Sequence, residues 1–101
     1  MTVRTEAGGV YVVCCSGEFD QDTVGALKAA CDHEAADAAL LVLDVKDVVF
    51  ADSSFLNTLL ALRNTRPLVL AGPLRDQLQR LLEMTGALPL FGMRDGSAQA
   101  G

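Results

Sequence analysis

Residues 40–60 read LLVLDVKDVVFADSSFLNTLL, and this stretch gives the clearest indication of the chain's secondary structure. The residues from Leu40 to Val45 are apolar on both faces of an extended chain, which is typical of a central parallel strand covered on two sides. From Phe55 to Asn64 the apolar residues fall on one broad arc of a helical wheel. Residues 52–54, Asp-Ser-Ser, stand where the hydrophobic segment ends and the helix starts. The stretch therefore predicts a buried strand followed by an amphipathic helix.

Upstream, the apolar run Val10–Cys15 predicts a second buried strand. A shorter strand at Val3–Thr5 is expected to precede it, with Gly8-Gly9 as the turn. A helix should follow, and Asp20 and Asp22 are its candidate caps. Its expected buried face consists of Val24, Leu27 and Cys31. Strand, helix and strand together make one βαβ unit, for which a right-handed crossover is expected.

Downstream, Leu68–Leu70 predicts a third buried strand, and Gly72-Pro73 is expected to open another helix. The predicted buried face of that helix consists of Leu74, Leu78, Leu81 and Leu82. Gly86 is its expected terminator, and Leu88–Phe91 is a candidate edge strand that would tolerate Pro89. The predicted organisation is a single domain over residues 1–93 and a flexible tail over residues 94–101.

The composition is that of one α/β domain with its own core. The chain has 101 residues, half of them hydrophobic, and no tryptophan. A net charge of −5 argues against nucleic-acid binding, which needs a basic surface. Neither a signal peptide nor an apolar run long enough to span a membrane is recognisable, so a cytoplasmic protein without direct membrane contact is expected.

The three cysteines are expected to be buried free thiols. Cys14 and Cys15 are adjacent, so on a strand they point to opposite faces and cannot pair readily with each other. With Cys31 and the single histidine, His33, they offer too few ligands for a zinc site. No metal and no cofactor is predicted.

The Asp52-Ser53-Ser54 triplet admits a structural and a functional interpretation. Asp and Ser are favoured helix caps, because their side-chain oxygens accept hydrogen bonds from the first free N–H groups of the helix. In the functional interpretation, the same helix start tolerates a phosphate, since its free amides and dipole favour negative charge. A phosphoserine adds about −1.5 to −2 charges. The fold should survive this charge, whereas an interface with another protein should not.

Several stretches in the same order resemble STAS domains, in particular bacterial anti-sigma factor antagonists. Residues 41–60 resemble the family signature, an aliphatic strand ending in Asp, then D-S-S/T-G-L-G and an aliphatic helix. Residues 16–20, SGEFD, resemble the family's G-E-x-D, and residues 67–73 and 81–86 resemble its C-terminal half. The resemblance implies an α/β fold, a STAS-like mixed sheet of four to five strands with α-helices packed on it.

The resemblance also implies a switch. An unphosphorylated antagonist binds an anti-sigma factor that is also a serine kinase, and so frees the sigma factor for transcription. The kinase phosphorylates the first serine of the pair, here Ser53, and a PP2C-type phosphatase restores it. The expected partner-binding residues are Asp20, Asp52, Ser54, Phe55, Asn57 and Thr58. Phe55 and Asn57 stand where the commoner pattern has glycine.

Three alternatives remain open. A hydrolase using Ser53 would need a base, but no G-x-S-x-G elbow is present and His33 lies at the end of another predicted helix. A nucleotide-binding module would be expected to carry a Walker or G-x-G-x-x-G loop, and neither occurs. A STAS scaffold subunit of a stress-signalling complex or a lipid transporter would keep the fold without phosphorylation. The prediction is a non-enzymatic protein that binds other proteins.

Overall fold

The described residues of the computed structural model, 1–35 and 37–95, form one five-stranded sheet with its helices packed on it. The strands are β1 (Thr2–Glu6), β2 (Val10–Phe19), β3 (Leu40–Ala51), β4 (Leu68–Gly72) and β5 (Gly92–Asp95). The helices are α1 (Val24–Glu34), α2 (Ser53–Thr65), α3 (Asp76–Met84) and a short 3-10 turn, η1 (Leu88–Leu90). The predicted α/β mixed sheet is confirmed.

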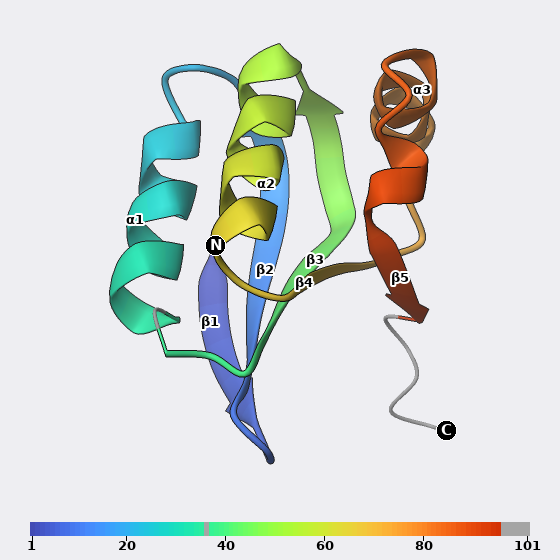
Figure 1. Cartoon of the computed structure of the whole chain (residues 1–101). Helices are drawn as coiled ribbons and strands as arrows, with labels where there is room; N and C mark the ends of the chain where they lie inside the picture. The colour runs from blue at the N-terminus through green and yellow to red at the C-terminus, as the bar shows by residue number, and fades with distance from the viewer. Residues whose placement is uncertain (36, 96–101) are drawn as a thin grey trace.

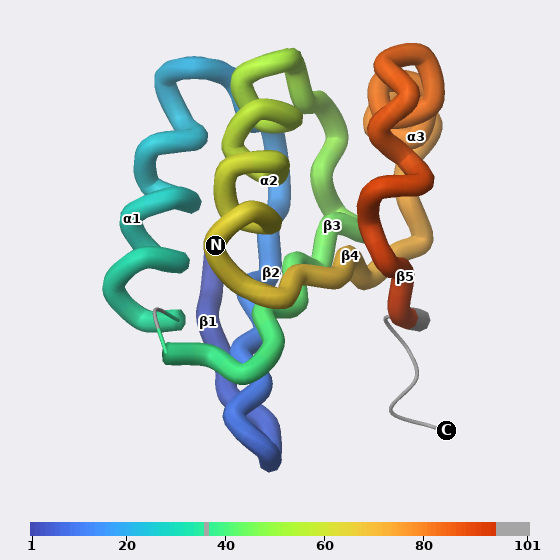
Figure 2. The backbone as a smooth tube through the Cα atoms, in the orientation of Figure 1, coloured from blue at the N-terminus to red at the C-terminus, as the bar shows by residue number. Residues whose placement is uncertain are grey.

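The strands lie in the order in which they occur along the chain, from β1 to β5. β1 pairs with β2 in antiparallel orientation, through a turn in which Gly8 and Gly9 both adopt positive φ. All other neighbouring strands are parallel. Figures 1 and 2 show α1 and α2 side by side on one face of the sheet.

The main core lies between this face and the helices, because alternate residues of each strand point towards it. All three helices contribute fully buried side chains to it, among them Leu27, Leu59 and Leu78. On the opposite face, a smaller apolar cluster centres on Val12 and Val42. Cys15 lies in the main core and Cys14 beside the smaller cluster, as expected for neighbours on one strand.

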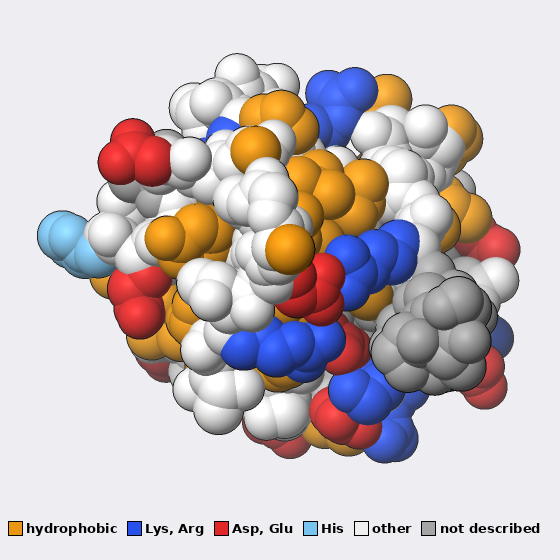
Figure 3. Space-filling model, turned by 90° about the horizontal axis from the view of Figure 1, so that it is seen from below, with side chains coloured by type: hydrophobic (Ala, Val, Ile, Leu, Met, Phe, Trp, Pro, Cys, Tyr) orange, Lys and Arg blue, Asp and Glu red, His pale blue; other side chains and the backbone are white. Residues whose placement is uncertain are grey.

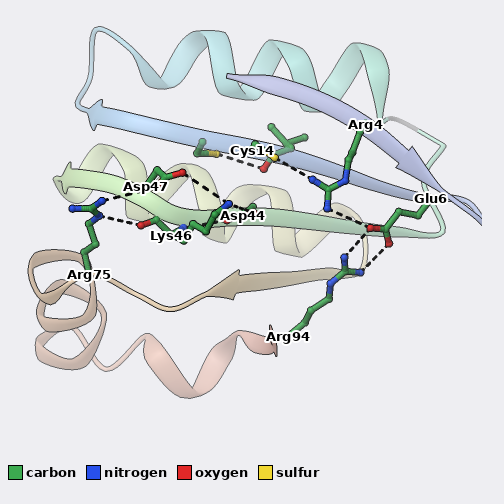
Figure 4. Close-up of polar contacts among 10 residues, drawn as sticks. Arg4, Glu6, Cys14, Asp44, Lys46, Asp47, Arg75 and Arg94 are labelled. Carbon is green, nitrogen blue, oxygen red and sulfur yellow. Dashed lines mark hydrogen bonds and ion pairs between the residues drawn. The ribbon is translucent and has the colours of Figure 1, made fainter. Parts of the chain in front are cut away.

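Charged side chains lie over the smaller cluster and connect the two outer strands (Figure 4). The Arg94 guanidinium donates to both carboxylate oxygens of Glu6, at 3.2 and 3.0 Å. The hydrogen bond from Arg94 holds the pKa of the Glu6 carboxyl below its ordinary value. In the middle of the sheet, the buried carboxylate of Asp44 accepts a hydrogen bond from Lys46 Nζ at 2.9 Å.

The C-terminal part differs from the prediction in three respects. Leu88–Phe91 is not an edge strand: residues 88–90 form the turn η1, closed by a hydrogen bond from Leu90 N to Ala87 O, and the strand begins at Gly92. Gly72 does not open a helix, because β5 pairs with β4 as far as Gly72 and α3 begins at Asp76. The domain continues to Asp95, beyond the predicted boundary at 93; the rest of the predicted tail lies outside the described residues.

Strands β2 and β3 are also longer than their apolar runs. β2 continues through Ser16 and Gly17 to Phe19, and β3 continues through Lys46 to Ala51. The two extensions pair with each other, with shifts in register after Cys14 and Gly17. They carry the predicted functional residues to one end of the sheet.

Candidate functional site

The predicted residues gather where two parallel strands end. Phe19, the last residue of β2, is the register partner of Ala51, the last residue of β3. The next residues, Asp20 and Asp52, therefore lie on neighbouring connections, and Asp52 N donates to Phe19 O at 3.2 Å. Figure 1 shows both connections at the upper end of the sheet. We call this end, defined by Asp20 and residues 52–54, the serine end.

Asp52 is the N-cap of α2, as the triplet predicts. Its backbone is extended, and its carboxylate oxygen Oδ1 accepts hydrogen bonds from Ser54 N at 2.8 Å and Phe55 N at 3.4 Å. Two of the free amides of the helix start are thus satisfied by one carboxylate. The capping interpretation of Asp52 is confirmed, and it leaves the next side chain free for another role.

Ser53 is the first residue of α2, and it is exposed. Among the described residues, none forms a hydrogen bond with its hydroxyl group. The cap is Asp52, so replacing or modifying the Ser53 hydroxyl removes no contact that begins the helix. Ser53 meets the condition that a modification switch requires, which is a hydroxyl open to another protein at the electropositive start of a helix.

The helix surface next to Ser53 carries three more predicted residues. Asn57 is exposed and lies one turn after Ser53. Ser54 and Thr58 are half-buried, and the Thr58 hydroxyl donates to the backbone oxygen of Ser54 at 2.9 Å. Polar groups therefore line the outer side of the first two turns.

Phe55 does not belong to this surface. Its side chain is 0% exposed, and its ring packs against that of Phe19 with ring centroids 5.1 Å apart. The prediction that Phe55 contacts a partner is wrong, because position 55 lies on the same face of α2 as Leu59 and Leu62 and points into the core. Phe55 instead packs the start of α2 against the end of β2.

Asp20 lies on the predicted loop but does not cap α1. The N-cap of α1 is Thr23, and it makes no side-chain cap hydrogen bond. Asp20 Oδ1 accepts from Asp22 N at 2.9 Å, and Asp20 N donates to Thr23 Oγ1 at 2.8 Å. Aspartate is favoured at helix starts, so the sequence predicts Asp20 and Asp22 as caps. In the structure, Asp20 instead closes the turn before the helix.

Two features of the serine end could not be identified from the sequence pattern. Val49 and Phe50, two apolar residues near the end of β3, are 47% and 42% exposed. They add exposed apolar side chains to the end of β3. Gln77 of α3 forms two hydrogen bonds with the backbone of Ala51, directly before Asp52. No sequence signal connects Gln77 to this site.

Neither the buried cysteines nor the histidine is placed or charged to act as a catalytic partner of Ser53. Burial raises the pKa of the Cys15 thiol to about 12 and that of Cys31 to about 11, so both stay neutral at physiological pH. His33 is in the last turn of α1, whereas Ser53 is in the first turn of α2. Figure 1 shows these two turns at opposite ends of the helix pair, so His33 cannot act as a base for Ser53.

Further observations limit the kinds of site in the described part of the chain. It contains no group of three or more His, Cys, Asp or Glu side chains placed to hold a metal ion. Of its helices, none combines the length and the apolar character that crossing a bilayer requires. The end away from Ser53, seen from below in Figure 3, carries acidic and basic side chains interleaved.

Comparison with known proteins agrees with this architecture. A family model described as Mlab, STAS domain, matches residues 3–89. An anti-sigma factor antagonist from Mycobacterium paratuberculosis has a similar structure, with a TM-score of 0.80 and 29% identity over 91% of this chain and 81% of that chain. No curated protein matches the sequence.

Two further structures share the fold at low identity. The anti-sigma factor antagonist SpoIIAA in its unphosphorylated form gives a TM-score of 0.79 at 14% identity, over 98% of this chain and 91% of that chain. The Bacillus cell fate determinant SpoIIAA in the phosphorylated form gives 0.71 at 14% identity, over 98% and 95%. Since the family model matches most of the sequence, this chain belongs to the STAS domain family.

Proposed function

We propose that this chain is an anti-sigma factor antagonist, whose association with an anti-sigma factor serine kinase is switched off by phosphorylation of Ser53. The observation that carries the proposal is the exposed Ser53 at the start of α2, beside a separate cap residue. The resemblance of the whole chain, in sequence and structure, to anti-sigma factor antagonists supports the same function.

The switch follows from the charges at the serine end. A phosphate on Ser53 would lie in water at the positive end of the α2 dipole, so the isolated domain tolerates it. In a complex, the same phosphate would lose its water, and its repulsion from the neighbouring Asp52 carboxylate would no longer be screened by solvent. Added charge therefore destabilises the complex far more than the fold.

The proposed docking surface consists of a polar and an apolar part. Asp20, Ser54, Asn57 and Thr58 form the polar part around Ser53, and Asp52 lies at its centre. Val49 and Phe50 add exposed apolar side chains, the kind of surface that contributes most of the affinity when a partner covers it. The helical residues of the polar part lie within the first two turns of α2, and Val49 and Phe50 lie four and three residues before Ser53 in the sequence.

The proposed partners are an anti-sigma factor with serine kinase activity and a PP2C-type phosphatase that removes the phosphate. Such a system operates in the cytoplasm, where we place the chain, and no catalytic role is assigned to it. The chain is the substrate of both enzymes, so its own contribution is a hydroxyl and the surface around it.

A capture experiment from the native cell tests the proposal. Ser53→Ala as bait should retain an ATPase-type anti-sigma factor, while the wild-type chain incubated with that kinase and ATP should gain one phosphate, located at Ser53 by mass spectrometry. Phosphate found only at other residues would refute the assignment of Ser53.

A second candidate keeps the fold without the switch. The alternative is a STAS scaffold subunit of a stress-signalling complex or a lipid transporter, and the match to the STAS family model fits this alternative as well. In that case the Ser53→Ala bait would retain a transporter ATPase or a signalling scaffold, and Ser53 would carry no phosphate in the cell.

A further inference from the structure

The second half of β3 has a strand on one side only. β4 pairs with β3 from Leu41 to Asp44, and no β4 residue pairs with β3 beyond that point. From Asp47 to Ala51, β3 pairs with β2 alone. The other edge of this segment faces α3, so its backbone groups there need partners that are not strands.

Gln77 supplies these partners at the end nearest to Ser53. Ala51 N donates to Gln77 Oε1 at 2.8 Å, and Gln77 Nε2 donates to Ala51 O at 2.8 Å. A carboxamide carries the same donor and acceptor as a peptide group, so one side chain takes the place of a neighbouring strand. Arg75 acts similarly further back, where its Nε donates to Lys46 O at 3.0 Å.

The segment before Ser53 is therefore held from two sides. On one side, Asp52 N donates to Phe19 O of β2. On the other side, both backbone groups of Ala51 are bound by Gln77 of α3. Ala51 itself is buried, and Asp52, the next residue, caps α2. The conformation in which Ser53 is presented thus depends on a residue of α3.

We propose that Gln77 is a positioning residue for Ser53: it holds the end of β3 in the conformation that the kinase recognises. This inference rests on the proposed function. Gln77 acts through the Ala51 backbone, so its loss should loosen the segment while the Asp52 cap and the core remain. A kinase then meets the competent conformation less often, which raises the apparent KM and leaves kcat nearly unchanged.

Two substitutions separate hydrogen bonding from packing. Gln77→Met keeps a side chain of similar length without either hydrogen bond. Gln77→Glu keeps the acceptor for Ala51 N, but at neutral pH its carboxylate faces Ala51 O and cannot donate. Gln79→Met is the matched control on the same helix, because the Gln79 side chain is exposed and donates to Glu83, one turn further on in α3.

The first measurement is amide hydrogen exchange by NMR, which needs no partner. In Gln77→Met, the protection factor of the Ala51 amide should fall about tenfold, the effect of one hydrogen bond, while Val42 and Leu43 keep theirs. In Gln77→Glu, the carboxylate still accepts from Ala51 N, so the Ala51 amide should keep more protection than in Gln77→Met. This protection should rise further as the pH falls through the ordinary range of a glutamic acid, about 4.3, since the protonated side chain can again donate to Ala51 O. Gln79→Met should behave as wild type.

The second measurement is phosphorylation of Ser53 by the cognate kinase. Gln77→Met should raise KM about tenfold with kcat within about twofold of wild type. Unchanged KM and unchanged Ala51 protection would overturn the inference, as would a loss of protection spread equally over all core amides. A fall in kcat alone would also overturn it.

The two proposals fail in different ways. If the wild-type chain gains no phosphate at Ser53, the proposed function fails, and the role of Gln77 towards the serine fails with it. If the wild-type chain is phosphorylated at Ser53 and Gln77→Met behaves as wild type in both measurements, only the role of Gln77 is wrong.

Discussion

Helices α1 and α2 lie side by side, and the contacts at one end of the pair differ from those at the other end. At the far end, Arg66 ties them together: its guanidinium donates to Cys31 O at 2.9 Å and to Asp32 Oδ1 at 3.0 Å. At the serine end, α2 is attached to the end of β2 instead, through the packing of Phe55 on Phe19 beneath the surface. Ser53, above this contact, is exposed.

One end of α2 therefore makes structural contacts, whereas the other end presents side chains that a partner could bind. The far end uses its charged side chains for internal contacts. The serine end places an aromatic pair inside and leaves the hydroxyl, Asn57 and the apolar side chains of Val49 and Phe50 on the surface. A charge added at this end therefore acts on whatever binds there. Five predictions test this contrast, from the largest expected effect on stability to the smallest.

Phe55→Ala should have the largest effect. It removes a fully buried ring and leaves a cavity between α2 and β2, which costs about 3–5 kcal/mol of unfolding free energy. Urea denaturation measures this, with Asn57→Ala on the exposed side of the same helix as the control, expected to change stability by about 0.5 kcal/mol or less. A loss below about 1 kcal/mol for Phe55→Ala would show that the aromatic pair does not fasten the serine end.

Arg66→Met should have the next largest effect, at the far end. It leaves Cys31 O without the charged donor and breaks the ion pair with Asp32, at a cost of about 2 kcal/mol. Lys28→Met is the matched control, because Lys28 binds the same carboxylate from the exposed surface, where an ion pair contributes about 0.5 kcal/mol or less. Equal losses in the two variants would contradict the role given to Arg66.

Asp52→Ala should cost about 1 kcal/mol, because two amides at the start of α2 lose their acceptor. Asp52→Asn keeps a capping oxygen and should restore most of the stability. If the two variants were equally destabilised, the charge of Asp52 rather than its hydrogen bonds would be the important property.

Acid should weaken the far end. Hydrogen bonds from Lys28 and then Arg66 hold the pKa of Asp32 below its ordinary value of 3.8. The folded state therefore favours the carboxylate, so the stabilisation is complete above about pH 4 and is lost as the pH falls through the lower folded-state pKa. Urea midpoints between pH 5 and 2 should fall more steeply for wild type than for Asp32→Asn; parallel curves would contradict this.

Ser53→Asp should have the smallest effect on stability and a large one on binding. The unfolding free energy should change by less than about 0.5 kcal/mol, since an acidic residue suits the first turn of a helix. Affinity for the anti-sigma factor, measured by calorimetry, should fall at least tenfold, whereas the neutral Ser53→Asn should bind nearly as wild type. A large loss of stability would show that Ser53 is a structural residue.

Apolar periodicity was sufficient to predict several elements of the fold. The run Leu40–Val45, the one-sided apolar face after residue 52 and the glycine pair before Val10 identified the central strand, α2 and the first turn, because these are local patterns. The Asp-Ser-Ser triplet identified the cap and the exposed serine for the same reason. For these elements, the types and spacing of neighbouring residues were sufficient for the prediction.

Other features depend on residues that are distant in the sequence, so local patterns could not predict them. The extension of β3 to Ala51, the strand at Gly92 and the ion pair of Glu6 with Arg94 require partners far away in sequence. Phe55 lies on the apolar face of α2, but the periodicity of the helix does not show that its ring packs on Phe19. Gln77 reaches Ala51 because β4 ends its pairing with β3 early. A residue pattern does not show which backbone groups of a strand lack a neighbouring strand. In β3, the groups beyond Asp44 lack β4 as a neighbour, and Gln77 of α3 binds those of Ala51.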